Sequence, residues 1–449
     1  MPRVSAVSAD DAGESRYGDA GRVAAAGLSL APFRGLRYDP GRVSSLAAVT
    51  SPPYDVVDAD GRVRLETGDP HNVVRLILPR PEPTAESGYR RAAALLAAWQ
   101  RSGVLAADPA PALYVYEQRS PDEDGGTLQR GLIGALAVSG PQAGVVLPHE
   151  DVMPRPVADR VGLMRTTKAN LEPILLTYRG DGSAAAVIER TAEQPPLLTT
   201  TTSDGTTHRL WSVTAQRDLA TVSKDLATCR ALIADGHHRW AMYLRLQREH
   251  RYLAHSPWDR GLVLLVDTAR YPLRVRAIHR VLHQLPPEQA LAALTPLGDA
   301  WTVTEPGRTQ EAAMNALQAA KAAGLNAFVL AGDGRFRLLT GPDKATVDAA
   351  VPADRPEEYR RLDATVLHAI LLDRVWNVPD APEHIGYVHD TAAAVREARS
   401  SGGTAVLLHP VAEGVVRRLA EQGVTMPRKS TSFGPKPATG LVLRSLLLG

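Results

Sequence analysis

The 449-residue chain contains a single cysteine, Cys229, and that scarcity excludes several classes of protein. One cysteine forms neither an internal disulfide framework nor a cysteine-based zinc cluster, and it fits a reducing compartment. No apolar run is long enough to span a bilayer. Residues 1–26 lack the apolar segment of a secretory signal, so we expect a cytoplasmic protein with a disordered tail at residues 1–27.

An excess of charge of one sign is also missing. The chain carries 51 Lys and Arg against 49 Asp and Glu, a formal net charge of +2. A nearly neutral chain has no general attraction for polyanions, and no helix-turn-helix pattern is visible. We therefore expect a small-molecule partner and neither a membrane nor a nucleic acid.

Helix and strand patterns alternate along the chain and predict a mixed α/β fold. Apolar residues at helical spacing predict helices at 87–101, 213–229, 310–323, 357–375, 391–399 and 411–422. Short apolar runs predict strands at 72–78, 112–117, 131–138, 172–178, 260–266, 274–282, 327–330, 336–339 and 405–408. A hairpin-like loop is predicted at 121–126.

The densest group of polar residues is the sequence Ala-Asp-Gly-His-His-Arg-Trp at 234–240. An apolar approach at 231–233 predicts a buried strand, Gly236 predicts a turn, and the following residues predict a helix. The first turn of a helix presents backbone N–H groups and a positive dipole end, which favour an anion.

The side chains of this motif extend the same chemistry. Arg239, His237 and His238 add hydrogen-bond donors, and Asp235 adds a carboxylate, so the motif suits a phosphate with a divalent cation nearby. A helix-capping aspartate beside a surface histidine pair would explain Asp235 alone. A transition metal such as zinc held by the two histidines is a further alternative.

A second candidate segment ends in Pro-His-Glu at 148–150, after an apolar run. Glu150 offers a carboxylate that can act as a base, and His149 is either a substrate contact or a structural histidine bonded to backbone. Arg160 follows on a predicted helix.

A Pro-Pro turn at 52–53 fixes Tyr54 and Asp55 in a loop, either as a wall of the site or as a plain turn with a packed tyrosine. Near the end of the chain, the loop 426–436 combines three cations with three hydroxyls. It can hold a phosphate or carboxylate, or it can be a solvated basic turn.

Taken together, these motifs support a comparison with a known family. PFRGLRY (32–38), SPPYDVV (51–57), LPHE (147–150), ANLEPILLTY (169–178), ADGHHRW (234–240), HR (279–280) and MPRKSTSFGPK (426–436) with TG (439–440) resemble, in order, the signatures of the family named domain of unknown function 1015. That family is similar in its core to the ParB/sulfiredoxin superfamily, and within it to the free-serine kinases. The resemblance implies a ParB/sulfiredoxin-like core at 141–268, with α/β additions at 28–140 and 269–449.

The resemblance also implies an activity, which is transfer of a phosphoryl group from ATP, ADP or pyrophosphate to the hydroxyl of free L-serine or a close analogue, giving O-phosphoserine. Mg²⁺ is the expected cofactor. His237 stands where a sulfiredoxin needs a cysteine, which excludes a sulfinic-acid reductase. A nucleotide-binding switch of the ParB type and a phosphate-ester hydrolase are the alternatives.

The expected roles of the site residues fall into four groups. The expected catalytic residues are Glu150, as base, with Asp235 and His237. The expected phosphate- or nucleotide-binding residues are Gly236, His238, Arg239, Lys429, Ser430, Thr431 and Lys436. The expected substrate-binding residues are His149, Tyr54, Asp55 and Arg160, and the expected metal ligand is Asp235.

Overall fold

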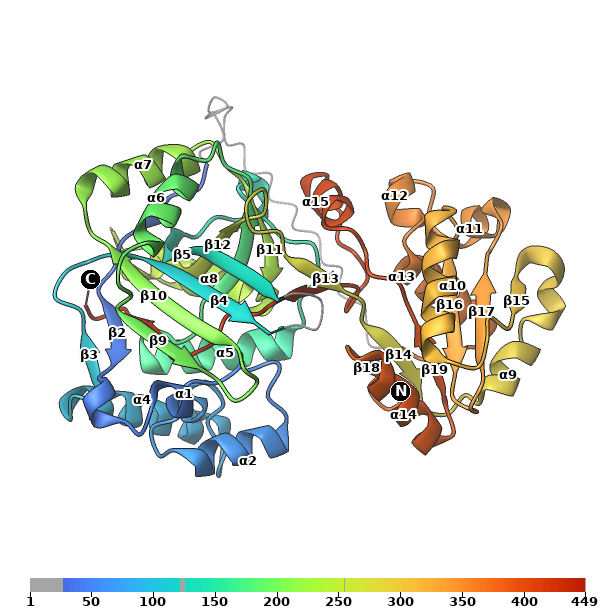
Figure 1. Cartoon of the computed structure of the whole chain (residues 1–449), viewed down its shortest axis with the longest axis horizontal. Coiled ribbons are helices and arrows are strands. Elements are labelled where there is room, and N and C mark those ends of the chain that lie inside the picture. Colours follow the sequence, from blue (N-terminus) through green and yellow to red (C-terminus); the bar gives the residue numbers. More distant parts are fainter. Residues whose placement is uncertain (1–26, 122–125, 254, 449) are drawn as a thin grey trace, which may run out of the picture.

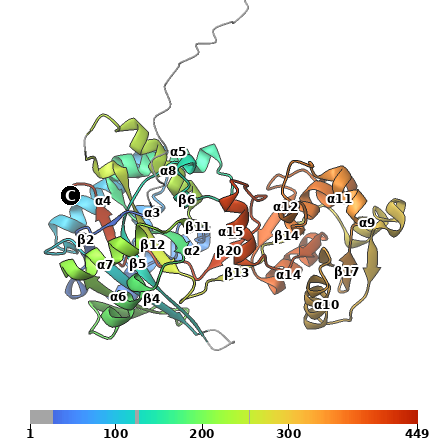
Figure 2. The ribbon, with the colours of Figure 1, turned by 90° about the horizontal axis from the view of Figure 1, so that it is seen from above.

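The computed structural model describes residues 27–121, 126–253 and 255–448, which form two lobes lying side by side (Figures 1 and 2). The predicted tail at 1–27 therefore falls outside the described residues except for Gly27, whose N–H donates to the Ala227 carbonyl. Most of the predicted loop at 121–126 falls outside them as well.

A large mixed sheet forms the centre of the first lobe. Its strands are β1 (Leu30–Ala31), β4 (Leu113–Ser120), β5 (Thr127–Ala137), β6 (Val146–Leu147), β8 (Ile174–Tyr178), β9 (Leu198–Thr201), β10 (Thr207–Val213), β11 (Ala231–Asp235) and β12 (Arg260–Asp267). Their order is β6-β11-β8-β12-β5-β4-β10-β9, with β1 paired to β5. β11 lies next to the edge strand β6, to which it runs parallel, and it runs antiparallel to β8. Its carboxyl end therefore lies near an edge of the sheet.

Both faces of this sheet are covered, because successive strand residues point to opposite faces. On one face, Leu176 packs in a core with the helices α5 (Pro154–Thr167), α6 (Ser183–Ala192), α7 (Gln216–Leu226) and α8 (His237–Glu249). On the other face, Leu175 packs in a core with α15 (Glu413–Glu421) and with later residues of the chain.

A four-stranded sheet closes the far side of the first lobe. Its order is β3-β2-β21-β7, from the strands at Leu105–Ala107, Gly35–Tyr38, Leu443–Ser445 and Ala169–Asn170 respectively. It packs with α1 (Leu46–Val49), α3 (Val74–Ile77) and α4 (Ala85–Arg101), and α2 (Ala59–Gly68) precedes α3. A capping box between Thr84 and Ser87 begins α4.

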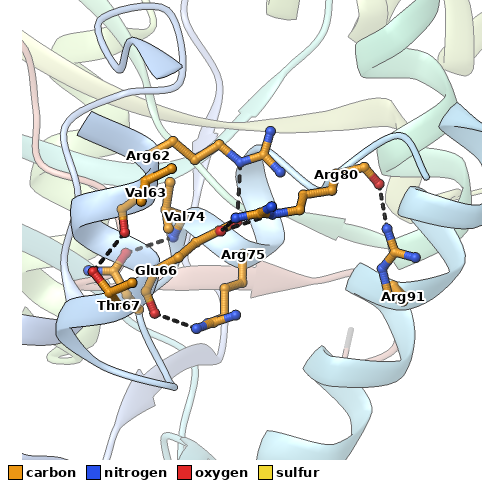
Figure 3. Close-up of polar contacts among 9 residues, drawn as sticks. Arg62, Val63, Glu66, Thr67, Val74, Arg75, Arg80 and Arg91 are labelled. Atoms are coloured by element: carbon orange, nitrogen blue, oxygen red, sulfur yellow. Dashed lines mark hydrogen bonds and ion pairs between the residues drawn. The ribbon is translucent and has the colours of Figure 1, made fainter. Parts of the chain in front are cut away.

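The helices α2 and α3 are tied together by arginines around Glu66 (Figure 3). Arg62 Nε and Arg80 Nε donate to the two carboxylate oxygens at 3.1 and 3.0 Å, and Arg75 donates to the Glu66 carbonyl. Because Glu66 is buried, these donors replace the water it loses on folding. They hold in place the segment that follows the Tyr54 loop.

The second lobe contains a six-stranded antiparallel sheet in the order β15-β17-β16-β19-β14-β18. These strands are Thr302–Thr304, Phe336–Thr340, Ala327–Ala331, Thr404–Leu407, His279–Leu282 and Ile385–Val388 respectively. One face packs on α10 (Gln310–Ala322) and α14 (Thr391–Ser401). The other packs on α9 (Pro287–Ala292), α11 (Lys344–Ala350), α13 (Asp363–Val366) and the π-helix η5 (Leu367–Val375), next to α12 (Glu357–Arg360).

A two-stranded ribbon connects the lobes: β13 (Arg274–Arg276) pairs with β20 (Ser432–Gly434). The sheets do not follow the predicted divisions at 140/141 and 268/269. β4 and β5 share a sheet with β8, β11 and β12, and residues 413–446 pack largely on the first lobe.

The mixed α/β class predicted from the sequence is confirmed. The predicted strand at 72–78 is wrong, because the short helix α3 occupies most of it, and its apolar residues apart from the half-buried Leu78 are buried without alternation. The predicted strand at 274–282 divides into β13 and β14, and the predicted helix at 357–375 divides into α12, α13 and the π-helix. In the described part of the chain, no helix has the length and apolar character needed to cross a membrane.

Candidate functional site

The motif at 234–240 forms the predicted strand–turn–helix. All five residues of β11 are buried, and Gly236 turns the chain into α8 with φ of 100°. A Cβ atom at this position would lie 3.1 Å from the Arg239 guanidinium, so both the backbone and the close approach require glycine. Within the described residues no side chain caps α8, which leaves the N–H groups of its first turn available to an anion.

Asp235 lies between two cations. Its Oδ2 is 2.6 Å from Arg239 Nη2, its Oδ1 is 2.6 Å from Lys436 Nζ, and Lys436 is also 2.5 Å from Asp55 Oδ2. Burial alone would raise the pKa of Asp235, but Lys436 and Arg239 outweigh burial and lower it below its usual value. The loop 426–436 therefore completes the charge balance of the motif.

The residues of this motif do not fit the predicted metal site. Both oxygens of Asp235 already face cations, which would repel a third positive charge. His237 and His238 accept hydrogen bonds from two different backbone N–H groups, so they do not converge on one ion. The described residues contain no group of three or more metal-ligating side chains.

The histidines hold the segment at 148–150 against the motif. His237 Nε2 accepts the N–H of His149 at 3.3 Å, and the two rings meet edge to face. His238 Nε2 accepts the N–H of Met153 at 3.1 Å. Burial lowers the pKa of His149 to about 3, with a contribution from His237, and burial likewise lowers the pKa of His237 to about 3, with a contribution from His238. Both rings are therefore neutral near pH 7 and act by position rather than by charge.

Glu150 lies at the rim of the same site. Its Oε1 accepts the backbone N–H of Lys429 at 3.1 Å, and it pairs with Met426 in an isolated bridge. The residue is only partly buried. Within the described residues, its other oxygen has no hydrogen-bond partner. That oxygen is available to an incoming hydroxyl.

Two of the three hydroxyls of the loop 426–436, those of Ser430 and Thr431, are used internally, contrary to the phosphate-binding role expected of them. Ser430 Oγ donates to the Pro427 carbonyl at 2.5 Å, and Thr431 Oγ1 lies 2.9 Å from His149 Nε2. Lys429 differs: it is exposed, and it forms no ion pair with another described residue. Of the residues expected to bind phosphate from this loop, Lys429 remains free to do so.

Tyr54 lies between two arginines. The Arg160 and Arg239 guanidinium carbons lie 4.4 and 5.7 Å from the centre of its ring. Burial raises the pKa of Tyr54 to about 12 against the opposite influence of both arginines. Arg160 is itself buried and donates to the Ile77 carbonyl. Tyr54 thus packs between the two guanidinium groups, whereas its neighbour Asp55 pairs with Lys436.

Glu172, which was not predicted as a site residue, fixes this loop. Its Oε1 accepts the N–H of Tyr54 at 2.9 Å and faces the Thr439 hydroxyl at 3.4 Å. Burial raises the pKa of Glu172 although Arg239 and Arg160 oppose the shift. In the sequence, the signal that could have identified Glu172 was its position beside a proline at the start of an apolar strand.

Two residues of the second lobe were not assigned to the site either, although Arg280 belongs to the HR pair at 279–280 of the family signature. Burial lowers the pKa of His389, assisted by Lys436 and Lys429, which places this imidazole within electrostatic reach of the site. Arg280 is fully buried and lies 3.1 Å from His368 Nε2 and 3.4 Å from the Arg428 carbonyl. The distance in sequence between these residues and the motif left no local signal for their contacts.

Comparison with known proteins now decides the family. A family model described as protein of unknown function (DUF1015) matches residues 30–365. The chain belongs to this family. The family resemblance read from the motifs is confirmed, and no curated protein matches the chain.

Several solved structures are similar to the family member described here. A free serine kinase mutant in complex with ADP aligns with 68% of this chain and 90% of its own, at 15% identity and a TM-score of 0.36. A conserved hypothetical protein from Pyrococcus furiosus aligns with 68% and 94%, at 15% identity and a TM-score of 0.34. SbnI with a C-terminal truncation, from Staphylococcus aureus, aligns with 70% and 88%, at 11% identity and a TM-score of 0.36.

Proposed function

We propose that this protein is a small-molecule kinase that transfers a phosphoryl group from ATP, ADP or pyrophosphate to the hydroxyl of free L-serine or a close analogue. The contact between Glu150 and the Lys429 N–H carries the proposal. This contact holds the Glu150 carboxylate, which has one oxygen available, against the loop 426–436. The Lys429 side chain of that loop is exposed and forms no ion pair with a described residue. The uncapped start of α8 adds N–H donors to the same site.

These groups suit phosphoryl transfer. Glu150 accepts the proton of the acceptor hydroxyl. At the same time, the hydroxyl oxygen forms a bond to the terminal phosphorus of the donor. The bond from that phosphorus to the bridging oxygen breaks, and the shortened donor leaves with the electron pair. Lys429 and the first-turn N–H groups of α8 stabilise the charge on the transferred group.

The remaining motif residues position these groups. Asp235 holds Arg239 and Lys436 in place, and His237 fixes the backbone next to Glu150. Because Asp235 faces two cations, no step in this scheme uses it as a metal ligand.

Phosphorus NMR on the purified protein with L-serine and each donor in turn tests the proposal. We expect an O-phosphoserine resonance that the variant Glu150→Gln reduces at least about 100-fold. Glutamine keeps an oxygen for the Lys429 N–H, so donor affinity is expected to stay within about twofold. Glu249→Gln, far along α8, is the matched control.

Other outcomes would redirect the proposal. Release of inorganic phosphate alone would favour a hydrolase over a kinase. Donor binding without any turnover would favour a nucleotide-dependent switch. Equal activity of Glu150→Gln and the control would remove Glu150 as the base.

A further inference from the structure

A large cavity lies between the lobes, and no motif role predicted from the sequence accounts for it. Its volume is about 690 Å³. Residues 151–154 and 425–428 of the first lobe form one wall, and residues of η5 in the second lobe form the other. Cavities of this size accommodate ligands larger than a free amino acid.

The wall from the second lobe has two unusual features. The π-helix η5 spans nine residues, whereas π-helices are rare and are found frequently at functional sites. Thr365, just before it, is 3% exposed and lines the cavity. Its hydroxyl has no hydrogen-bond partner within the described residues. A buried hydroxyl is normally satisfied, and because this oxygen is itself enclosed by protein, it is an unsatisfied polar group inside the wall and not a contact for a molecule in the cavity.

The wall from the first lobe is joined directly to the candidate site. The cavity begins at Asp151, next to Glu150, and the Met153 N–H binds His238. On the other side, the Met426 N–H donates to the His149 carbonyl at 2.8 Å. The cavity therefore adjoins the backbone that carries the proposed base, although Glu150 itself is not among its lining residues.

The lining of the cavity is amphipathic. Val152 and Met153 are 39% and 38% exposed, and Leu372 and Val378 face the same space. Arg355 also lines it, is exposed, and forms no ion pair with another described residue. Arg428, by contrast, is paired with Asp380 at 2.9 Å. The available chemistry is an apolar surface with one cation, Arg355, which stacks on Tyr359, and two exposed carboxylates, Asp151 and Asp373, that form no ion pair with a described residue.

We infer that this cavity binds the acceptor, and that the acceptor is an amphipathic hydroxyl compound larger than free serine. Its apolar part contacts Val152, Leu372 and Val378, and its anionic group faces Arg355. The hydroxyl then reaches Glu150. This inference rests on the proposed kinase function and changes its acceptor from a free amino acid to a substituted one.

Calorimetry of the full chain with two probes, L-serine and N-octanoyl-L-serine, tests the inference. We expect the acylated probe to bind at least tenfold more tightly. Ala369→Trp, which fills the cavity from η5, and Arg355→Ala, at the surface, should each weaken its binding at least fivefold. Ala345→Trp, exposed in the same lobe, is the control and should change nothing.

The outcomes separate the cavity from the chemistry. Equal affinity for both probes, or unchanged affinity in Ala369→Trp and Arg355→Ala, would overturn the inference. Cavity-dependent binding of the acylated probe, with phosphorus NMR showing its phosphorylation, would support both proposals. The same binding without phosphoryl transfer from any donor would support the site and overturn the kinase function.

Discussion

Lys436 Nζ lies 2.6 Å from Asp235 Oδ1, so a loop near the end of the chain supplies a cation to a motif in its middle. The same ammonium group reaches Asp55, which comes from the Pro-Pro loop near the start of the structure. Three segments distant in sequence thus meet at one nitrogen. The integrity of the site depends on this junction.

Replacement of Lys436 should therefore destabilise the fold. Lys436→Met leaves the buried Asp235 with one cation fewer, and removing one partner of a buried ion pair costs about 3 kcal/mol. Urea unfolding measures the loss. Lys344→Met, which breaks the exposed pair with Asp348, should cost less than about 1 kcal/mol. Equal losses in the two variants would show that the junction adds no stability.

Gly236 should resist substitution more strongly than another glycine with the same backbone. Gly236→Ala strains a left-handed residue by about 1–2 kcal/mol and also presses on Arg239. Gly182 starts α6 with φ of 96°, and its nearest neighbour would lie at 3.9 Å, so Gly182→Ala measures the strain alone. We expect lower donor affinity, by calorimetry, only in Gly236→Ala. Normal donor affinity in Gly236→Ala would show that the conformation of this turn does not matter for donor binding.

The buried histidines should make stability fall with acidification. The pKa of His149 and that of His237 are both about 3 in the folded protein, below the ordinary value of about 6.5. As pH falls below 6.5, these two histidines bind protons in the unfolded chain but not in the folded chain. The free energy of unfolding then decreases by up to about 1.4 kcal/mol per pH unit per histidine, until about pH 3.

Urea unfolding between pH 7 and pH 4 checks this slope. His237→Gln should make the slope shallower, whereas His255→Gln, at an exposed position, should leave it unchanged. An imidazole of His149 or His237 that titrates near pH 6.5 by NMR would contradict the prediction.

Lys429 should contribute to donor binding without contributing to stability. Its side chain is exposed and forms no ion pair with a described residue, so Lys429→Ala breaks no ion pair in the described part of the chain. Loss of one hydrogen bond to a charged group corresponds to roughly tenfold weaker binding of ADP or ATP by calorimetry. Lys224→Ala on α7 is the control. Unchanged affinity in Lys429→Ala would place the loop outside the donor site.

The sequence was sufficient for the local part of the site. β11, Gly236 and α8 follow from an apolar run, a glycine and helical spacing within one short stretch, and the structure has all three. α3 was misread for a physical reason: Asn72 accepts the Val74 N–H and donates to the Ala48 and Thr50 carbonyls. The two bonds to distant carbonyls set the conformation of a run whose apolar residues, apart from the half-buried Leu78, are all buried.

The non-local part of the site could not be read in the same way. Hydroxyl content suggested that Ser430 and Thr431 bind phosphate, but their contacts with the Pro427 carbonyl and His149 depend on how the loop folds back. The same holds for Asp235, whose carboxylate suggested a metal until Lys436 was found beside it. Residue type indicates which chemistry is possible, and tertiary contact decides which of it is used.

The ribbon of β13 and β20 has a consequence for modularity. The chain passes into the second lobe after Arg276, and near the other end of the segment that forms this lobe the Leu408 N–H donates to His279 Nδ1 at 3.2 Å, so entrance and exit lie together. The sheets of the first lobe take no strand from residues 277–409. A segment with adjacent ends can be exchanged without rethreading its host. Replacement of that segment would rebuild one wall of the cavity while leaving the strand, turn and helix of the motif in place.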